Sequence, residues 1–407
     1  MPTLAEARAL DAADPIAGYR KQFALPPGVI YLDGNSLGAL PLGTAARLGE
    51  VIRREWGEGL VRSWNDADWI GLPRRIGAMI APLIGAEADE VIACDSTSVN
   101  LFKLIAAALA MRSGRKVVLS EPGNFPTDLH LIAGLEAQGL AERRLAPPEE
   151  LKAALDDSVA VLLLTHVHYK SGAMHDMARL TRAAHRAGAL VLWDLSHSAG
   201  AVPVDLNGCE ADLAVGCGYK YLNGGPGAPA FAYAARRHHE ALQQPLTGWM
   251  GHAAPFAFTD DYAPAPGIDR LLTGTPPILG LAALEEGVRL IAEIGVERLA
   301  AKSHALSEFL RVAVAQTAPG LPCVSPQDPA PRGSQLSYRH PEAYAIAQAL
   351  IARGVIPDFR DPDILRLGLA PAYLRFEDCW HAAQALGEVL ASGEWERAEF
   401  RTRAAVT

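Results

Sequence analysis

An alternation of short apolar runs with amphipathic helical patterns between Val91 and Ala234 constrains the fold more than any other feature. The apolar runs are nearly continuous, as in strands that are buried on both faces of a mostly parallel sheet. The expected strands are VVLS (117–120), VAVLLLTHV (159–167), ALVLWD (189–194), DLAVGCG (212–218) and APAFAYA (228–234). A helical pattern at 177–187 stops at Gly188, as a helix end should. Strands alternating with helices predict a doubly wound α/β domain.

The pattern changes after about Val296. A long amphipathic helix is followed by a second helical segment, the strand DILRLGLAP (363–371) and a closing helix, which together predict a smaller α+β domain. We therefore divide the chain into an N-terminal segment 1–50 that packs with the small domain, a large α/β domain 51–295 and a small C-terminal domain 296–407.

Composition narrows the class of protein. A formal net charge of -9 argues against a nucleic-acid or anionic-membrane surface, because both favour clustered Lys and Arg. No window approaches the roughly 20 apolar residues of a membrane-spanning helix, and the N-terminus does not resemble a signal peptide. Five scattered cysteines without a C-x-x-C pair favour neither a disulfide framework nor a zinc site, and a reducing cytoplasm fits them best.

Two charged residues follow neighbouring predicted strands. Asp194 ends a strongly apolar strand in LVLWDLSHSAG, and Lys220 follows the next strand in GCGYKYLNGGPG. Ligands of open α/β sheets bind at the carboxyl ends of strands. Pyridoxal phosphate (PLP) needs an amine for its aldehyde and a carboxylate that keeps its pyridine nitrogen protonated. For either residue alone, a helix cap or a surface lysine is the better explanation, but the pair together favours PLP.

Two further segments suit such a cofactor. Asp95, Ser96, Thr97 and Ser98 crowd the start of a strong helix, where free backbone N–H groups hold anions such as phosphate. A plain helix cap accounts for one of these residues but hardly for all four. In EPGNFPTD (121–128), Phe125 could stack on a pyridine ring and Asp128 could accept a hydrogen bond, although a turn with a packed Phe explains this segment equally well.

The motifs together resemble the kynureninase family, PLP-dependent enzymes with the fold type I architecture of the aminotransferase superfamily. The resemblance runs from about Tyr31 to the C-terminal helix. It rests on WDLSHSAG, GCGYKYLNGGPG, YLDGNSLGALP (31–41), EPGNFPTDLH (121–130), LTGWMGH (246–252) and LTGTPPILG (272–280). It implies hydrolysis of L-kynurenine to anthranilate and L-alanine in tryptophan catabolism, with 3-hydroxykynurenine as a further family substrate.

The resemblance also assigns the cofactor site. It implies that Lys220 carries PLP as a Schiff base, Asp194 holds the pyridine nitrogen and Phe125 stacks on the ring. The other implied cofactor contacts are Thr97, Ser98, Asp128, Thr165, His197, Tyr219, Trp249 and Thr275. Family members are homodimers with shared sites, so Trp249 and Thr275 are expected to come from the partner subunit.

Substrate residues follow from the same resemblance. Arg366 matches the arginine that grips the substrate α-carboxylate, and its planar fork suits a carboxylate; a surface ion pair or a role for Arg360 instead are the alternatives. Tyr219 is the expected proton donor and phosphate ligand, unless it is only a packed tyrosine; His197 could likewise be only structural. Trp64 and Thr275 replace a histidine and an asparagine of the animal-type enzymes, which favours L-kynurenine over 3-hydroxykynurenine.

The same residues fit other classes of protein less well. The histidines at 166, 168, 238 and 239 lack a convincing third ligand, so no metal site is expected. A cysteine desulfurase of the same fold needs a mobile nucleophilic cysteine, and neither Cys323 nor Cys379 lies in an obvious flexible loop. A class V aminotransferase and a non-catalytic PLP-binding protein are the remaining alternatives.

Overall fold

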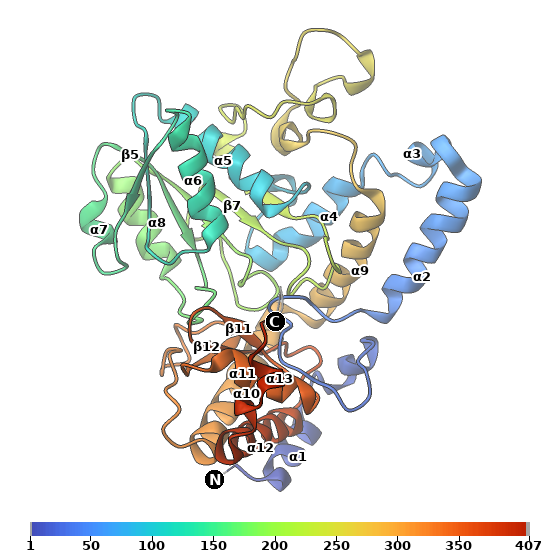
Figure 1. Ribbon diagram of the computed structural model, residues 1–407. Coiled ribbons are helices and arrows are strands. Elements are labelled where there is room, and N and C mark those ends of the chain that lie inside the picture. Colours follow the sequence, from blue (N-terminus) through green and yellow to red (C-terminus); the bar gives the residue numbers. More distant parts are fainter. Residues whose placement is uncertain (1, 404–407) are drawn as a thin grey trace.

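A computed structural model describes residues 2–403 (Figure 1). The large central sheet has seven strands in the order β2-β8-β7-β6-β5-β3-β4. Strand β8 runs antiparallel to its neighbours β2 and β7, and the other neighbouring strands pair in parallel. The strand bounds are β2 Val91–Ala93, β3 Val117–Ser120, β4 Glu142–Leu145, β5 Val159–Thr165, β6 Leu190–Asp194, β7 Leu213–Gly216 and β8 Phe231–Ala234. The predicted doubly wound α/β architecture is therefore confirmed.

Helices cover both faces of this sheet, as the apolar composition of its strands requires. Successive residues of β6 alternate between two cores: Leu190 and Leu192 face one, while Val191 and Trp193 face the other. Helix α5 (Thr97–Met111) and α6 (Pro126–Ala137) pack into the first core. Helices α4 (Leu72–Ile80), α8 (Met177–Arg186) and α9 (Ile278–Ile294) pack into the second. This leaves the carboxyl ends of the strands for polar residues.

The smaller body is the α+β unit that the C-terminal sequence predicts. A three-stranded antiparallel sheet has the order β11-β12-β9, with bounds Asp358–Arg360, Ile364–Gly368 and Gln335–Arg339. Its helices are α10 (Val296–Thr317), α11 (Ala343–Ala352) and α12 (Phe376–Ser392), and Figure 1 shows them as a group below the large sheet.

The N-terminal segment contacts both bodies. Helix α1 (Leu4–Ala13) packs on α12, where Asp11 accepts a 2.7 Å hydrogen bond from the Phe376 N–H. Strand β1 (Ile30–Tyr31) pairs with β10 (Val355–Ile356). Helix α2 (Leu42–Glu50) instead packs on α9 of the large body. The domain limits 1–50, 51–295 and 296–407 stay predictions, and their residues 1 and 404–407 lie outside the described part.

The π-helix Val51–Gly59 continues α2, and the remaining α-helices are short: α3 (Ser63–Asp66), α7 (Leu151–Ala154) and α13 (Ala398–Arg401). A long connection between β8 and α9 contains the single-turn helix Trp249–Gly251 and extends away from the large body at the top of Figure 1. Among residues 2–403, no helix is both long enough and apolar enough to cross a membrane.

Candidate active site

Three neighbouring parallel strands bring polar side chains to one edge of the sheet. Thr165 is the last residue of β5, and it lies opposite Asp194, the last residue of β6. Asp194 in turn lies opposite Val215 of β7, and Lys220 follows the end of β7 by four residues. The register of the sheet therefore brings the carboxylate and the amine to the same edge, as the sequence predicts.

Lys220 is the centre of this edge. Its side chain is buried, and its Nζ atom lies 3.0 Å from Nε2 of His197. The same atom lies 5.6 Å from the ring centre of Phe125 and 5.8 Å from that of Tyr219. Burial lowers the pKa of Lys220, which favours a neutral, nucleophilic amine. Burial and the nearby Lys220 also hold the pKa of His197 well below its usual range, so its imidazole is neutral.

Two carboxyl groups face this amine. Asp194 is buried and accepts a 2.8 Å hydrogen bond from the Ser196 N–H. Burial raises the pKa of Asp194, while that hydrogen bond and Lys220 act in the opposite direction. Asp128 of α6 is fully buried, and burial together with the charge of Asp194 raises its pKa well above the usual range. The site thus concentrates ionisable groups that water does not reach.

Two buried polar atoms at this edge lack a partner within residues 2–403. They are Oδ1 of Asp128 and Nδ1 of His197. The other Asp128 oxygen accepts a 3.4 Å hydrogen bond from the Thr165 hydroxyl, which also donates to Asn124. Thr165 therefore contacts Asp128 directly. Buried polar atoms without partners are costly unless a ligand completes them.

The start of α5 offers donors for an anion. Ser96 caps the helix by accepting a 3.3 Å hydrogen bond from the Val99 N–H. The next two residues, Thr97 and Ser98, keep their hydroxyl groups free of hydrogen bonds within the described part of the chain. Their position in the first turn gives them the free N–H groups and the positive end of the helix dipole.

Arg366 lies in a second cluster, on β12 of the small body. It is fully buried and donates to the Ser36 hydroxyl at 2.7 Å, to the Tyr169 carbonyl at 2.8 Å and to the carboxylate of Asp358. The Tyr169 ring packs edge-on against Phe125, with 5.3 Å between ring centres. This contact connects the arginine cluster to the lysine edge.

Arg360 competes for the same partners. Its guanidinium lies 2.8 Å from Asp358 and 3.0 Å from the Ser36 hydroxyl, but its side chain is one-third exposed. A second carboxyl, Asp33, lies 3.9 Å from Arg366, and its Oδ1 atom has no hydrogen-bond partner within residues 2–403. Burial and the nearby Asp358 raise the pKa of Asp33 to about 7.

Three predicted site residues lie apart from these clusters within this chain. Trp249 is 38% exposed and stacks on Phe258 in the connection before α9, and Thr275 is exposed on the same connection. Trp64 lies in α3 and packs edge-on against Trp69. No contact joins any of the three to Lys220 among the described residues.

Sequence reasoning missed four residues of the two clusters: Asn124, Ser36, Asp33 and Asp358. Asp33 and Ser36 belong to the polar turn DGNS directly after β1, and a polar turn after an apolar strand could have singled them out. Asp358 carries no comparable local signal.

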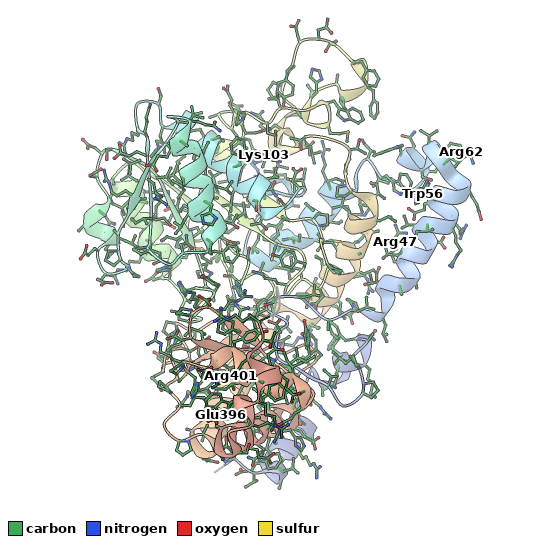
Figure 2. The ribbon with its side chains drawn as sticks, in the orientation of Figure 1. Arg47, Trp56, Arg62, Lys103, Glu396 and Arg401 are labelled. Carbon is green, nitrogen blue, oxygen red and sulfur yellow. The ribbon has the colours of Figure 1, made fainter. Side chains whose placement is uncertain are left out.

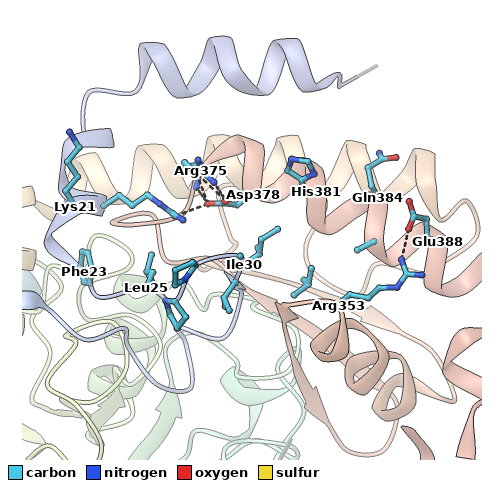
Figure 3. A pocket seen from close by; sticks show the side chains of 17 residues that line it. Lys21, Phe23, Leu25, Ile30, Arg353, Arg375, Asp378, His381, Gln384 and Glu388 are labelled. Atoms are coloured by element: carbon cyan, nitrogen blue, oxygen red, sulfur yellow. Dashed lines mark hydrogen bonds and ion pairs between the residues drawn. The ribbon is translucent and has the colours of Figure 1, made fainter. Parts of the chain in front are cut away.

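A cavity of about 880 Å³ lies elsewhere, between the N-terminal segment and α12 (Figure 3). Several cations line it, but carboxylates already compensate them: Asp378 pairs with Arg20 and Arg375, and Glu388 pairs with Arg353. No strand of the central sheet ends there. Volume alone therefore does not mark the active site.

The lysine edge fits PLP. A buried amine, a carboxylate on the neighbouring strand end, an aromatic ring beside the amine and free hydroxyls at a helix start match the aldehyde, pyridine and phosphate of this cofactor. The unpartnered atoms of Asp128 and His197 are further positions that a polar ring substituent can complete.

Comparison with solved structures identifies the class. A cysteine desulfurase from Thermococcus onnurineus matches with a TM-score of 0.80 and 19% identity over 92% of this chain and 98% of that one. A variant of C-DES with glycine covalently linked to its PLP cofactor matches with a TM-score of 0.77 and 18% identity over 91% and 99%. This likeness shows the fold, which is that of PLP-dependent enzymes of fold type I.

Sequence relatives identify the family. The model of the kynureninase C-terminal domain matches residues 299–386. A kynureninase from Burkholderia mallei is 53% identical, and one from Pseudomonas fluorescens is 49% identical, each over the full length of both chains. The chain belongs to the kynureninase family. The predictions of the family, of fold type I and of a PLP-dependent enzyme are confirmed.

The environments of Cys323 and Cys379 also argue against a cysteine desulfurase. Cys379 is fully buried within α12, and Cys323 is partly buried, with burial raising the pKa of both thiols. A nucleophilic cysteine must form a thiolate that reaches the substrate. Neither cysteine meets that requirement.

Proposed function

We propose that this protein binds PLP at Lys220 and hydrolyses L-kynurenine to anthranilate and L-alanine. The observation that carries the proposal is the buried Lys220 amine, which lies beside Phe125 and at the same sheet edge as Asp194. The full-length relatives named kynureninase support this reaction over others of the same fold.

The cofactor is assigned to residues of both the sheet edge and α5. Lys220 holds the aldehyde carbon, Asp194 the pyridine nitrogen and Phe125 one face of the ring. The remaining contacts are Thr97 and Ser98 at the phosphate, with Asp128, Thr165, His197 and Tyr219 around the ring and its substituents. Bound PLP supplies an imine carbon for the substrate amine and a protonated ring that withdraws electrons from the substrate.

Lys220 also moves a proton. Its amine is buried, and His197 is its one hydrogen-bond partner within residues 2–403; with PLP and the substrate amine bound, Lys220 would be available as a base beside them. Burial lowers its pKa toward the range of a general base, so it can take the proton from the substrate α-carbon. Neutral His197 accepts a hydrogen bond from this amine and keeps it directed at the site.

Arg366 binds the α-carboxylate of the substrate, because a guanidinium fork matches a carboxylate with two hydrogen bonds. Its Nε atom has no partner within residues 2–403. Asp358 and Ser36 orient the guanidinium. The Tyr219 hydroxyl donates the proton that completes L-alanine, since burial raises the pKa of this tyrosine and keeps it protonated.

The working form is a homodimer. Trp249, Phe256 and Phe258 form an aromatic cluster on the extended connection before α9, and Phe258 is 76% exposed in the single chain. Trp56, which Figure 2 labels on the helix that continues α2, is 59% exposed. Exposed aromatic groups of this size mark interaction surfaces. In the dimer, Trp249 and Thr275 contribute to the partner's cofactor site.

L-Kynurenine is the preferred substrate over 3-hydroxykynurenine. Trp64 and Thr275 stand where the animal-type pattern has histidine and asparagine, which removes polar groups that could reach a ring hydroxyl. The five free cysteines favour a reducing cytoplasm as the compartment.

Anthranilate fluorescence tests the proposal directly. Purified protein with PLP and L-kynurenine should produce the fluorescence of anthranilate together with one equivalent of L-alanine. A protein that binds PLP at Lys220 and forms no anthranilate would refute the activity while leaving the cofactor assignment intact.

A further inference from the structure

A buried ion pair lies beside the phosphate-binding start of α5. The Lys103 side chain on α5 (Figure 2) is fully buried, and its Nζ atom lies 2.5 Å from a carboxylate oxygen of Asp95. The same nitrogen donates to the carbonyl of Leu271, in the connection before α9. A buried ammonium without its carboxylate is strongly unfavourable, so this pair is fixed in place.

Contacts fix both the backbone and the side chain of Asp95. Its carbonyl accepts a 2.9 Å hydrogen bond from the Ala230 N–H, and its backbone has a φ of +47°, a left-handed conformation that a non-glycine residue adopts at a cost. The next residue, Ser96, is the cap of α5. The position of Asp95 therefore sets the turn that presents Thr97 and Ser98.

The same carboxylate holds the connection before α9. The Thr273 hydroxyl donates to Asp95 at 3.2 Å, and the Thr273 carbonyl accepts a 3.1 Å hydrogen bond from the Met250 N–H. The contact is close, because a Cβ atom on Gly248 would lie 2.3 Å from the Thr273 carbonyl oxygen. Trp249 and Thr275 are thus each within two residues of this network.

We infer that Asp95, Lys103 and Thr273 are positioning residues. They connect the phosphate-binding turn at the start of α5 to the loops around Trp249 and Thr275, which the same subunit contributes to the partner's site. The inference rests on the proposed function, which assigns Thr97 and Ser98 to the phosphate and Trp249 and Thr275 to the partner. It makes cofactor binding in each site depend on the ion pair of both subunits.

Thr273→Val is the sharpest variant, because it removes one hydroxyl and keeps the side-chain shape and the ion pair. Mixed dimers then separate the effect on the variant's own cofactor site from the effect on the partner's site. In a dimer of one Lys220→Ala/Thr273→Val chain and one wild-type chain, only the wild-type subunit can hold lysine-bound cofactor. The site of that wild-type subunit receives its partner loops from the variant chain. The reference is a Lys220→Ala chain paired with wild type.

The measurement is the PLP dissociation constant, from the visible absorbance of lysine-bound cofactor. We expect it to rise about tenfold relative to the reference, the size of one lost hydrogen bond to a charged group. Amide exchange of the apoprotein at Met250 should quicken in the Thr273→Val homodimer. A Thr273→Val chain paired with a Lys220→Ala chain should show a similar loss in its own site.

Lys302→Met provides the matched control. Lys302 of α10 also forms a buried pair, 2.7 Å from Asp14 of the N-terminal segment and remote from α5. Its loss should lower stability without changing the PLP dissociation constant, whereas Asp95→Asn/Lys103→Met should change both. An unchanged constant in the wild-type subunit of the mixed dimer overturns the inference, even if the variant's own site weakens. A wild-type protein that sediments as a monomer instead refutes the shared site of the proposed function, and this inference with it.

Discussion

The lysine edge and the arginine cluster are both buried and charged, but they differ in how far the protein itself completes them. Lys220 has only a neutral histidine within hydrogen-bond distance, and atoms of Asp128 and His197 lack partners among the described residues. Arg366 already contacts a carboxylate, a hydroxyl and a carbonyl.

This difference separates two ways of preparing a binding site. The lysine edge keeps buried polar atoms without hydrogen-bond partners. A cofactor that supplies those partners gains binding free energy, because these atoms are already desolvated. In the arginine cluster, Asp358 already pairs with Arg366, so it orients the guanidinium but also competes with the incoming carboxylate. Affinity is expected from the first region and substrate selection from the second.

The largest expected effect tests the lysine edge. Lys220→Ala removes both the cofactor attachment and the general base, so the visible absorbance of lysine-bound PLP should vanish and kcat should fall by at least about 1000-fold. Lys116→Ala, at an exposed lysine on the same domain, should behave like wild type. A yellow spectrum unchanged in the Lys220 variant would end this assignment.

The arginine cluster comes next. Replacing Arg366 with methionine leaves the substrate carboxylate unpaired and should lower kcat/KM by about 30-fold to several thousand-fold, or about 2–5 kcal/mol. Arg360→Met serves as the matched comparison, because it shares Asp358 but is partly exposed, and it should cost less than about tenfold. If Arg366→Met lost under threefold, the carboxylate would bind elsewhere.

Protonation of Asp33, beside the arginine cluster, should affect how the free energy of unfolding depends on pH. Because Asp33 has its folded pKa raised to about 7, its contribution is full below pH 4 and is lost as the pH rises through 7. Between pH 5 and 8, wild type should lose on the order of 2 kcal/mol relative to Asp33→Asn. Urea unfolding at the two pH values measures this. The exposed Asp157→Asn should run parallel to wild type, and equal pH slopes for wild type and Asp33→Asn would contradict the raised pKa.

The smallest expected effect lies outside both clusters. Trp64→His should shift relative kcat/KM toward 3-hydroxykynurenine by about two- to tenfold, since one added polar contact is weak in a pocket that already accepts the ring. Competition between the two substrates measures the ratio. An unmoved ratio in the Trp64 variant removes the basis for the proposed preference.

The lysine edge was accessible to sequence reasoning because parallel strands end at a common edge. Apolar runs located β5, β6 and β7 within a few residues, and the register then brought Thr165, Asp194 and the Lys220 loop together. The boundaries were less certain: the strand predicted over 159–167 ends at Thr165, where the chain leaves the sheet and Val167 bridges to Met174.

The arginine cluster was accessible only in part. The resemblance to the family singled out Arg366, and Asp358 lies opposite it on the neighbouring strand β11, but Ser36 and Asp33 come from a segment more than 300 residues away in the chain. No periodicity or spacing connects such residues. Their proximity follows from how the N-terminal segment packs against the small sheet.

By itself, the sequence determined the α/β class, five of the seven strands of the large sheet and the pair of Asp194 and Lys220, because burial patterns and strand ends are local properties of the chain; it did not single out β2 and β4. Only the tertiary structure decided which carboxylates surround Arg366 and that Lys103 and Asp95 join the start of α5 to the loops before α9. Those contacts depend on desolvating charges between distant segments, and the energy of a buried charge is defined only once its surroundings are in place.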